Sequence, residues 1–332
     1  MTGGFPAPAP GASSRCNPTL LPAPDGGARP PVSARSEPRN PDQGLAVRRP
    51  RSPARSLNLA MVRAVYGALG PLVPGLLSRW ALRQFMATRR YPSPAREQRW
   101  RAGARRAVLA CPGGEVVTYA WGDGPTVLLV HGWNGRAGQL GGLGEALARA
   151  GRRAVAFDAP GHGESSGRHT SLFQILEVIQ ALDGTHGPFQ GVIAHSFGVA
   201  CATAALGKGL RAGRAVCLSP PARMAGMVDA FADFVGLPQK VRRALERRME
   251  KRFGPGLWAV ASPETAARTL DTPALIIHDR DDREVPWEQG ERVANAWPGA
   301  CLMTTRGLGH RRILRDRDVI RRCTDFITGA PQ

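Results

Sequence analysis

The most constraining feature of this chain is a series of short apolar runs that alternate with helical segments from residue 115 onward. Thr126–Val130 (TVLLV) and Ala215–Leu218 (AVCL) are continuous apolar runs, which is typical of strands buried on both faces. The strands expected are 115–121, 126–130, 153–157, 191–194, 215–218, 274–278 and 300–304, and the helices between them are 140–150, 172–182, 199–206, 288–296 and 319–327. This alternation predicts an α/β fold, a mostly parallel sheet flanked by helices on both faces.

A helical stretch with charged faces interrupts the alternation between the runs 215–218 and 274–278. We interpret residues 220–262 as a small helical lid inserted into a domain that spans residues 111–332. Met227, Phe231 and Phe234 recur at the spacing of one helix face. This face either packs the lid on the core or covers an apolar pocket.

The N-terminal third of the chain has a different character. Residues 1–56 are rich in Pro, Arg, Ser and Ala without apolar periodicity, so we expect a disordered tail. Residues 57–110 are expected to form an N-terminal helical extension. Its apolar run 64–78 contains two prolines and is shorter than the roughly 20 residues that span a bilayer. We expect it to dock on the domain or to rest on a membrane, with residues 61–80 as the candidate peripheral membrane contact.

The net charge of +19 is concentrated at the front of the chain, where the first 110 residues carry +14. Only three of the 45 basic residues are Lys, and this preference for Arg is typical of a GC-rich genome. This explanation competes with a role of the Arg excess in binding nucleic acid, and we expect no nucleic-acid partner. The oligomeric state stays open.

The six cysteines form no Cys-x-x-Cys pair, and no Cys/His cluster has zinc spacing. Neither a Walker sequence nor a Gly-x-Gly-x-x-Gly follows the first buried strand. We expect no cofactor, no metal ion and a cytoplasmic location, with peripheral membrane attachment as the variant.

Five short motifs follow the predicted strands in a fixed order. They are His131-Gly132-Trp133, Asp158–Gly163 (DAPGHG), Ala194–Gly198 (AHSFG), Asp282–Pro286 (DREVP) and Gly307–His310 (GLGH). Each motif alone is weak, but the set and its order at strand ends are specific.

In this order the motifs resemble those of the α/β-hydrolase superfamily, over about residues 115–328. The resemblance implies that Ser196 is a nucleophile on a sharp strand-to-helix turn, written G-x-S-x-G in the family. Ala194 stands where the family has its first Gly, and its small Cβ should still allow the turn to close.

The same resemblance implies the triad order Ser, Asp, His, which Ser196, Asp282 and His310 follow. His310 would accept the Ser196 proton, and Asp282 would orient the imidazole. Asp279 and Asp281 crowd the same loop, and we favour Asp282 because it lies three residues before Val285-Pro286. The backbone N–H groups of Trp133 and Phe197 would form the oxyanion hole.

These residues favour a serine hydrolase that cleaves a carboxylic ester or thioester of a small-molecule acyl substrate through an acyl-enzyme on Ser196. Amide and carbon–carbon substrates are less favoured. The alternative is a catalytically degenerate hydrolase-fold protein that acts as a membrane- or partner-binding module.

Overall fold

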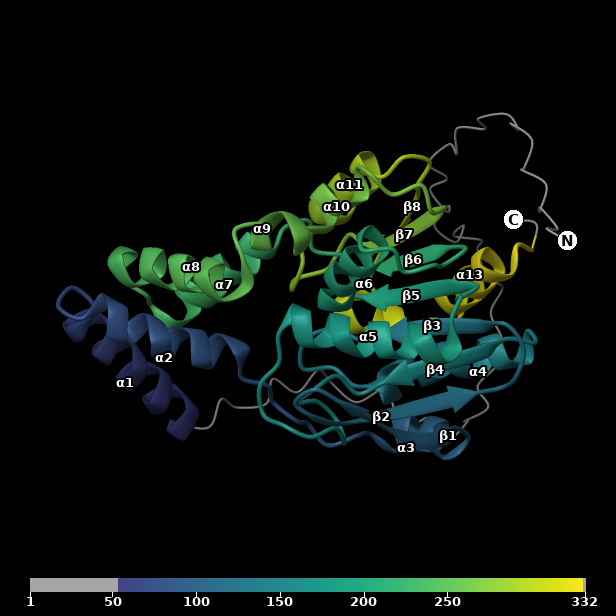
Figure 1. Ribbon diagram of the computed structural model, residues 1–332, viewed down its shortest axis with the longest axis horizontal. Coiled ribbons are helices and arrows are strands. Elements are labelled where there is room, and N and C mark those ends of the chain that lie inside the picture. Colours follow the sequence, from purple (N-terminus) through teal and green to yellow (C-terminus); the bar gives the residue numbers. More distant parts are fainter. Residues whose placement is uncertain (1–52, 331–332) are drawn as a thin grey trace, which may run out of the picture. The chain divides into compact units, whose positions relative to one another are not determined.

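The computed structural model describes residues 53–330, with side chains from residue 58 onward. An eight-stranded sheet in the order β1-β2-β4-β3-β5-β6-β7-β8 forms its centre (Figure 1). The strands are β1 (Arg105–Cys111), β2 (Gly114–Trp121), β3 (Thr126–Val130), β4 (Arg153–Phe157), β5 (Gly191–His195), β6 (Ala215–Leu218), β7 (Ala274–Asp279) and β8 (Cys301–Thr305). The strands from β4 to β8 in this order pair in parallel, whereas β2 is antiparallel to both β1 and β4. The predicted mostly parallel sheet is therefore confirmed.

Helices cover both faces of the sheet (Figure 1). On one face α4 (Gly141–Arg149) and α13 (Arg317–Thr328) pack with the buried sheet residues in one apolar core. On the other face α5 (Leu172–His186) packs on α6 (Phe197–Gly207), and α11 (Trp287–Ala296) packs on β7. The remaining elements here are α3 (Ala95–Ala102), α9 (Leu257–Val260), α10 (Pro263–Ala267), α12 (Gly309–Arg312) and the 3-10 helices Ala137–Leu140 and Ile313–Arg315.

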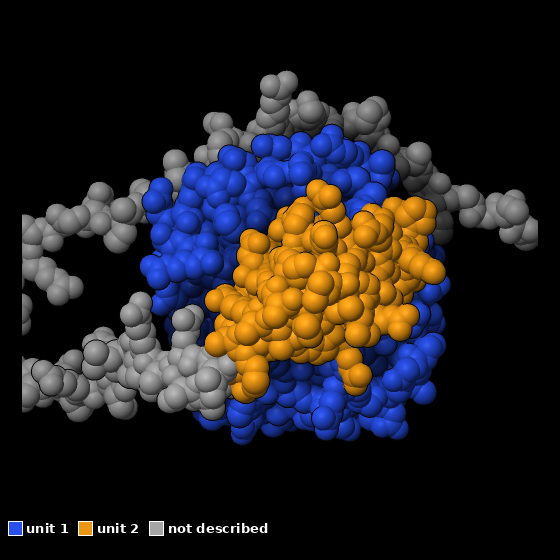
Figure 2. Space-filling model, turned by 90° about the vertical axis from the view of Figure 1, so that its left-hand side faces the viewer, with its two compact units in different colours: residues 1–19, 86–225, 256–332 blue, residues 20–85, 226–255 orange. Residues whose placement is uncertain are grey.

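The described chain divides into two compact units, coloured separately in Figure 2. The sheet unit comprises residues 86–225 and 256–330, and the helical unit comprises residues 53–85 and 226–255. The helical unit therefore joins two segments that the sequence analysis treated separately, the N-terminal extension and most of the lid.

The helical unit is built from α1 (Pro53–Leu69), α2 (Pro74–Met86), α7 (Met224–Val235) and α8 (Gln239–Phe253). The guanidinium of Arg63 on α1 donates to the carbonyl of Phe234 on α7 at 2.9 and 3.2 Å. Arg248 on α8 donates to the Ser78 hydroxyl at 3.0 Å and to the Gly75 carbonyl at 3.1 Å. Side chains from all four helices are buried in this unit, including Tyr66, Ala81, Val228, Val241 and Leu245.

Three boundaries differ from the sequence predictions. Residues 53–56, which we assigned to the disordered tail, begin α1, while residues 1–52 lie outside the described part of the chain. The helical extension predicted to end at residue 110 already contains β1, which pairs antiparallel with β2 at the sheet edge. The predicted lid 220–262 is wider than its compact part, 226–255.

The apolar run 64–78 is two helices rather than one, because the chain turns between Leu69 and Pro74. Proline has no N–H to donate and a fixed φ, so Pro74 is suited to begin a helix but not to continue one. Among residues 53–330, no helix has the length and apolarity needed to cross a membrane.

Candidate active site

Ser196 lies on the sharp turn between β5 and α6. Its backbone has φ 53° and ψ −123°, a strained conformation for a residue with a side chain. Gly198 allows the turn to close, because a Cβ there would lie 2.5 Å from the Val130 carbonyl oxygen. Ala194, which replaces the first glycine of the family motif, is buried within β5, and the turn closes as predicted.

Three side chains that are far apart in the sequence form one hydrogen-bonded chain at this turn. His310 Nε2 lies 3.0 Å from Ser196 Oγ, and His310 Nδ1 lies 2.7 Å from Asp282 Oδ2. With Nδ1–H donating to the carboxylate, Nε2 is the acceptor that faces the Ser196 hydroxyl. All three residues follow the carboxyl ends of parallel strands, β5, β7 and β8, which meet at one edge of the sheet.

The carboxylate of Asp282 is fixed by donors on both oxygens. Oδ1 accepts the backbone N–H groups of Glu284 and Val285, each at 2.9 Å. Oδ2 faces His310, and His278 Nε2 lies 3.4 Å from it. Burial acts to raise the pKa of Asp282, but the hydrogen bonds from His278, His310 and Val285 outweigh it and hold the pKa well below its ordinary value. Asp282 is therefore an anion that holds the His310 ring in one orientation.

Trp133 and Phe197 lie beside the nucleophile, on the loop after β3 and at the start of α6. Their rings meet edge to face with centroids 5.1 Å apart. The loop that carries Trp133 runs close to Ser196, because a Cβ on Gly132 would lie 3.0 Å from Ser196 Cβ. Phe197 is the first residue of α6, where backbone N–H groups have no acceptor within the helix.

A sequence profile of the alpha/beta hydrolase family matches residues 127–322, which include all five motifs. The chain belongs to this family. The matched range covers the Ser196, Asp282 and His310 positions and the inserted helices.

Solved structures of similar fold include hydrolases. A proposed lipase from Acinetobacter baumannii AYE superposes with a TM-score of 0.55 at 17% identity, covering 76% of this chain and 96% of its own. The esterase RhEst1 from Rhodococcus sp. ECU1013 has a TM-score of 0.51 at 18% identity, covering 69% of this chain and 100% of its own. At such low identity these structures show the shared fold alone.

A curated relative matches more closely over a short stretch. RutD of Pseudomonas syringae pv. syringae (strain B728a), a proposed carbamate hydrolase, is 43% identical over 47 residues. The match covers 14% of this chain and 18% of that relative. The chain therefore matches only about a fifth of the relative's length.

Asp279 and Asp281 are the alternatives to Asp282 as the acid of this alpha/beta hydrolase, and the structure gives the three carboxylates different partners. The fully buried Asp279 accepts the N–H groups of Asp281, Leu308 and Gly309 and the Thr305 hydroxyl, at 2.7 to 3.0 Å. Asp281 accepts the N–H of Gly307 at 2.8 Å.

Asp279 thus ties the end of β7 to the loop that carries His310, a role that sequence reasoning missed. Burial acts to raise the pKa of Asp279, but hydrogen bonds from Thr305 and the backbone keep it below the ordinary value. The one available signal was the place of Asp279 directly after the predicted strand 274–278.

His195 is a second residue that sequence reasoning missed. Its Nε2–H donates to the backbone carbonyl of His310 at 2.9 Å, and the two rings lie 4.7 Å apart. Burial, and then the neighbouring His310, lower the pKa of His195 to about 3. A neutral His195 therefore supports the position of His310 without competing for its proton.

Two further buried histidines shape the loop after β3. His131 Nε2 accepts the Ala159 N–H, and His162 Nε2 accepts the Asn134 N–H, both at 3.0 Å. Burial lowers the pKa of His131 to about 4 and that of His162 to about 3. Both rings are thus neutral acceptors whose hydrogen bonds are lost on protonation.

Because these histidines have lowered pKa values in the folded protein, we expect the protein to lose stability in mild acid. In the unfolded chain each would titrate near 6.5, whereas His131, His162 and His195 titrate near 3 to 4 when folded. Their contribution is therefore complete above about pH 6.5 and declines as the pH falls toward 4. Urea unfolding at intervals between pH 7.5 and 4.5 should give a steadily falling midpoint, with a shallower fall in His162→Gln. A midpoint that stays constant to pH 5 would contradict this assignment.

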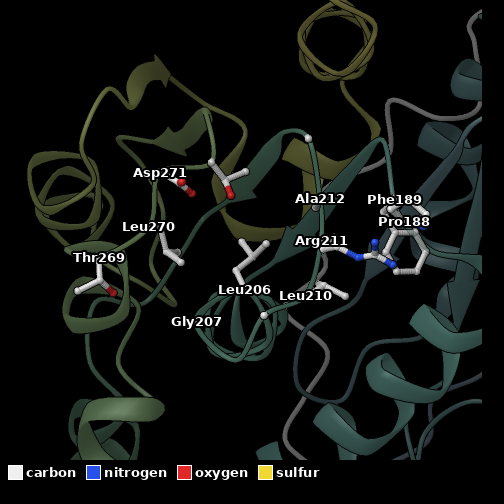
Figure 3. Close-up of a pocket in the computed structure, with 13 residues that line it drawn as sticks. Pro188, Phe189, Leu206, Gly207, Leu210, Arg211, Ala212, Thr269, Leu270 and Asp271 are labelled. Atoms are coloured by element: carbon white, nitrogen blue, oxygen red, sulfur yellow. The ribbon is translucent and has the colours of Figure 1, made fainter. Parts of the chain in front are cut away.

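A separate cavity of about 570 Å³ lies at the amino ends of the central strands, away from Ser196 (Figure 3). Its lining comes from three segments. Residues 188–189 precede β5, residues 206–213 run from the end of α6 toward β6, and residues 269–272 precede β7. Ligands of parallel α/β sheets bind at the carboxyl ends of the strands, where Ser196 lies. The cavity thus does not belong to the candidate active site. Among residues 53–330, no cluster of three His, Cys, Asp or Glu side chains is placed to hold a metal ion.

Proposed function

We propose that this alpha/beta hydrolase is a serine hydrolase that cleaves a carboxylic ester or thioester through an acyl-enzyme on Ser196. The observation that carries the proposal is the hydrogen-bonded chain Ser196–His310–Asp282, with distances of 3.0 and 2.7 Å. A serine hydroxyl is a weak nucleophile at neutral pH and needs a base within hydrogen-bond reach. The neutral Nε2 of His310 meets that requirement.

In the first half of the reaction, Ser196 Oγ attacks the acyl carbonyl while His310 Nε2 takes the hydroxyl proton. The carbonyl oxygen becomes an alkoxide, which the N–H groups of Trp133 and Phe197 would stabilise. The carbon–oxygen or carbon–sulfur bond to the leaving group then breaks, and His310 returns the proton to that group. Asp282 stabilises the imidazolium that exists between these two transfers.

In the second half, water replaces the alcohol or thiol. His310 removes one proton from the water as its oxygen attacks the acyl-enzyme, and then returns the proton to Ser196. The products are the free carboxylic acid and the regenerated serine. No redox partner or bound cofactor enters this sequence.

An acyl substrate is supported by the aromatic surroundings of Ser196 and by the relatives. The edge-to-face rings of Trp133 and Phe197 offer apolar surface beside the reacting carbon. Proteins of similar fold include the esterase RhEst1 and the thioesterase domain from the curacin biosynthetic pathway. Rate measurements on esters and thioesters of different acyl-chain length will determine which substrate is preferred.

Covalent labelling tests this proposal directly. A fluorophosphonate probe should modify the full chain, and peptide mass spectrometry should locate the adduct on Ser196. Ser166→Ala is the matched control, because Ser166 is an exposed serine whose hydroxyl donates to the Glu115 carbonyl. The control should label normally. The parent chain should also hydrolyse p-nitrophenyl esters and thioesters from a series of increasing acyl-chain length. A folded protein that neither labels nor hydrolyses any of them would instead be the degenerate binding module.

A further inference from the structure

Exposed apolar side chains are concentrated in the helical unit. Among the described side chains, eight large hydrophobic residues are exposed, and six belong to this unit. Four of them lie within eight residues at the turn between α1 and α2, and we call this group the apolar tip: Leu69, Leu72, Val73 and Leu76. Leu72 is 76% exposed and Leu76 is 63% exposed. Contiguous apolar surface of this kind marks an interaction site.

The apolar tip is not part of the core of the helical unit. On α2 the buried positions within the helical unit are Leu77, Ser78, Ala81 and Leu82, which follow the opposite helix face. On α2, Leu76 shares a face with the exposed Arg79 and Arg83, so this face passes from apolar to basic along the helix. The core is thus complete without the tip, whose apolar surface stays in contact with water.

The tip lies beside a basic helix of the same unit. A Cβ on Gly70 would lie 2.7 Å from Pro238 and 3.1 Å from Val241, at the start of α8. Further along, Arg248 holds the Gly75 carbonyl at 3.1 Å. The turn therefore packs against α8, which exposes basic side chains at Lys240, Arg243, Arg247, Lys251 and Arg252.

The charge of the helical unit is strongly one-sided. By sequence, residues 53–85 and 226–255 hold eleven Arg and Lys against four Asp and Glu. Three of the four acids, Asp229, Asp233 and Glu246, gather around the single guanidinium of Arg242. The exposed basic side chains of α8 are thus left to attract an anionic surface.

We propose that the helical unit binds the surface of an anionic lipid bilayer. The apolar tip enters the boundary between headgroups and acyl chains, and the basic side chains of α2 and α8 lie among the phosphate groups. A protruding aliphatic tip beside a basic helix matches this partner, because lipid supplies apolar and anionic surface in adjacent layers. The inference does not depend on the chemistry proposed for Ser196.

Vesicle flotation tests the inference with the full chain carrying Ser196→Ala, so that lipid hydrolysis cannot interfere. The protein should float with phosphatidylcholine vesicles that contain 30% phosphatidylglycerol, and at least about tenfold less with phosphatidylcholine alone. Raising NaCl from about 0.05 to 0.5 M should weaken the binding, because screening shortens the reach of the charges.

Two pairs of substitutions separate the contributions. Leu72→Ser with Leu76→Ser should lower the partition into anionic vesicles at least about tenfold. The two leucine side chains that would enter the acyl region of the bilayer are then lost. Arg243→Glu with Arg247→Glu should lower it by a similar factor. The matched controls are Val108→Ser, an exposed apolar residue of the sheet unit, and Arg168→Glu with Arg317→Glu, two exposed arginines of that unit. Both controls should float like the parent.

The outcomes that overturn the inference are distinct. Unchanged flotation of the Leu72/Leu76 variant would mean that residues outside the apolar tip hold the membrane, since that variant keeps the basic N-terminal segment. Absence of flotation by a folded protein that forms a Leu72-dependent dimer in size-exclusion chromatography would make the tip an interface between copies. Equal binding to neutral and anionic vesicles would remove the role of the basic helix.

Discussion

Replacing Ser196 with Ala is expected to lower kcat/KM for an activated ester by at least about 10³-fold. Its Oγ is the atom that His310 Nε2 contacts at 3.0 Å. The loss should fall on kcat rather than on KM, because the acyl-enzyme bond cannot form. Initial-rate kinetics on the purified parent and on the variant measure the effect.

Stability should not fall with activity in this variant. Ser196 has a strained backbone with positive φ, and alanine keeps the same Cβ in that position. The melting temperature of Ser196→Ala should therefore stay within a few degrees of the parent, as should that of the control Ser166→Ala. Turnover above a few per cent in the alanine variant would assign the nucleophile to another residue.

The central strands could be predicted from the sequence because they are buried on both faces. TVLLV in β3 and AVCL in β6 are continuous apolar runs between turn residues, which is the pattern of a buried strand. Both strands were predicted with the bounds that the structure has. β1 was missed for the opposite reason. Its sequence RRAVLAC is largely exposed on the edge of the sheet, so no buried face imposes an apolar pattern.

The pairing of the N-terminal helices with the lid helices could not be predicted. Each is an amphipathic helix, and periodicity identifies the buried face without identifying the partner. The contacts that join them, such as Arg63 with the Phe234 carbonyl and Arg248 with Ser78, link positions about 170 residues apart. A single sequence carries no signal for such distant pairs.

The candidate site was predicted where the signal is a local motif. Ser196, Asp282 and His310 each lie in a short motif at a strand end, and the structure brings the three side chains together. Asp279 and His195 were missed because the partners that give them their roles are backbone groups of a different loop, Leu308 and Gly309 for Asp279 and His310 for His195. Which backbone N–H groups reach Asp279 depends on the register between β7 and β8, where Asp279 pairs with Thr305.

Asp282→Asn is expected to lower kcat/KM by about 10⁴-fold, the size of loss known when a triad histidine takes the wrong tautomer. The two N–H groups of Glu284 and Val285 hold Oδ1, so an asparagine would keep its oxygen there. Its NH₂ group would then face His310 Nδ1 and favour the tautomer that carries its proton on Nε2. A protonated Nε2 cannot accept the Ser196 proton. Rates of parent and variant between pH 6 and 9 measure the loss.

Asp279→Asn and Asp281→Asn are matched controls for this prediction, because each makes the same chemical change as Asp282→Asn on the same loop. Asp281→Asn should change kcat/KM by less than about threefold, since Asp281 holds one N–H of the exposed Gly307. Asp279→Asn should lower kcat/KM about tenfold and also lower the melting temperature, because an NH₂ group in place of Oδ2 would oppose the Leu308 N–H and loosen the loop that carries His310. If Asp279→Asn is the most damaging of the three, Asp282 is not the acid that orients His310.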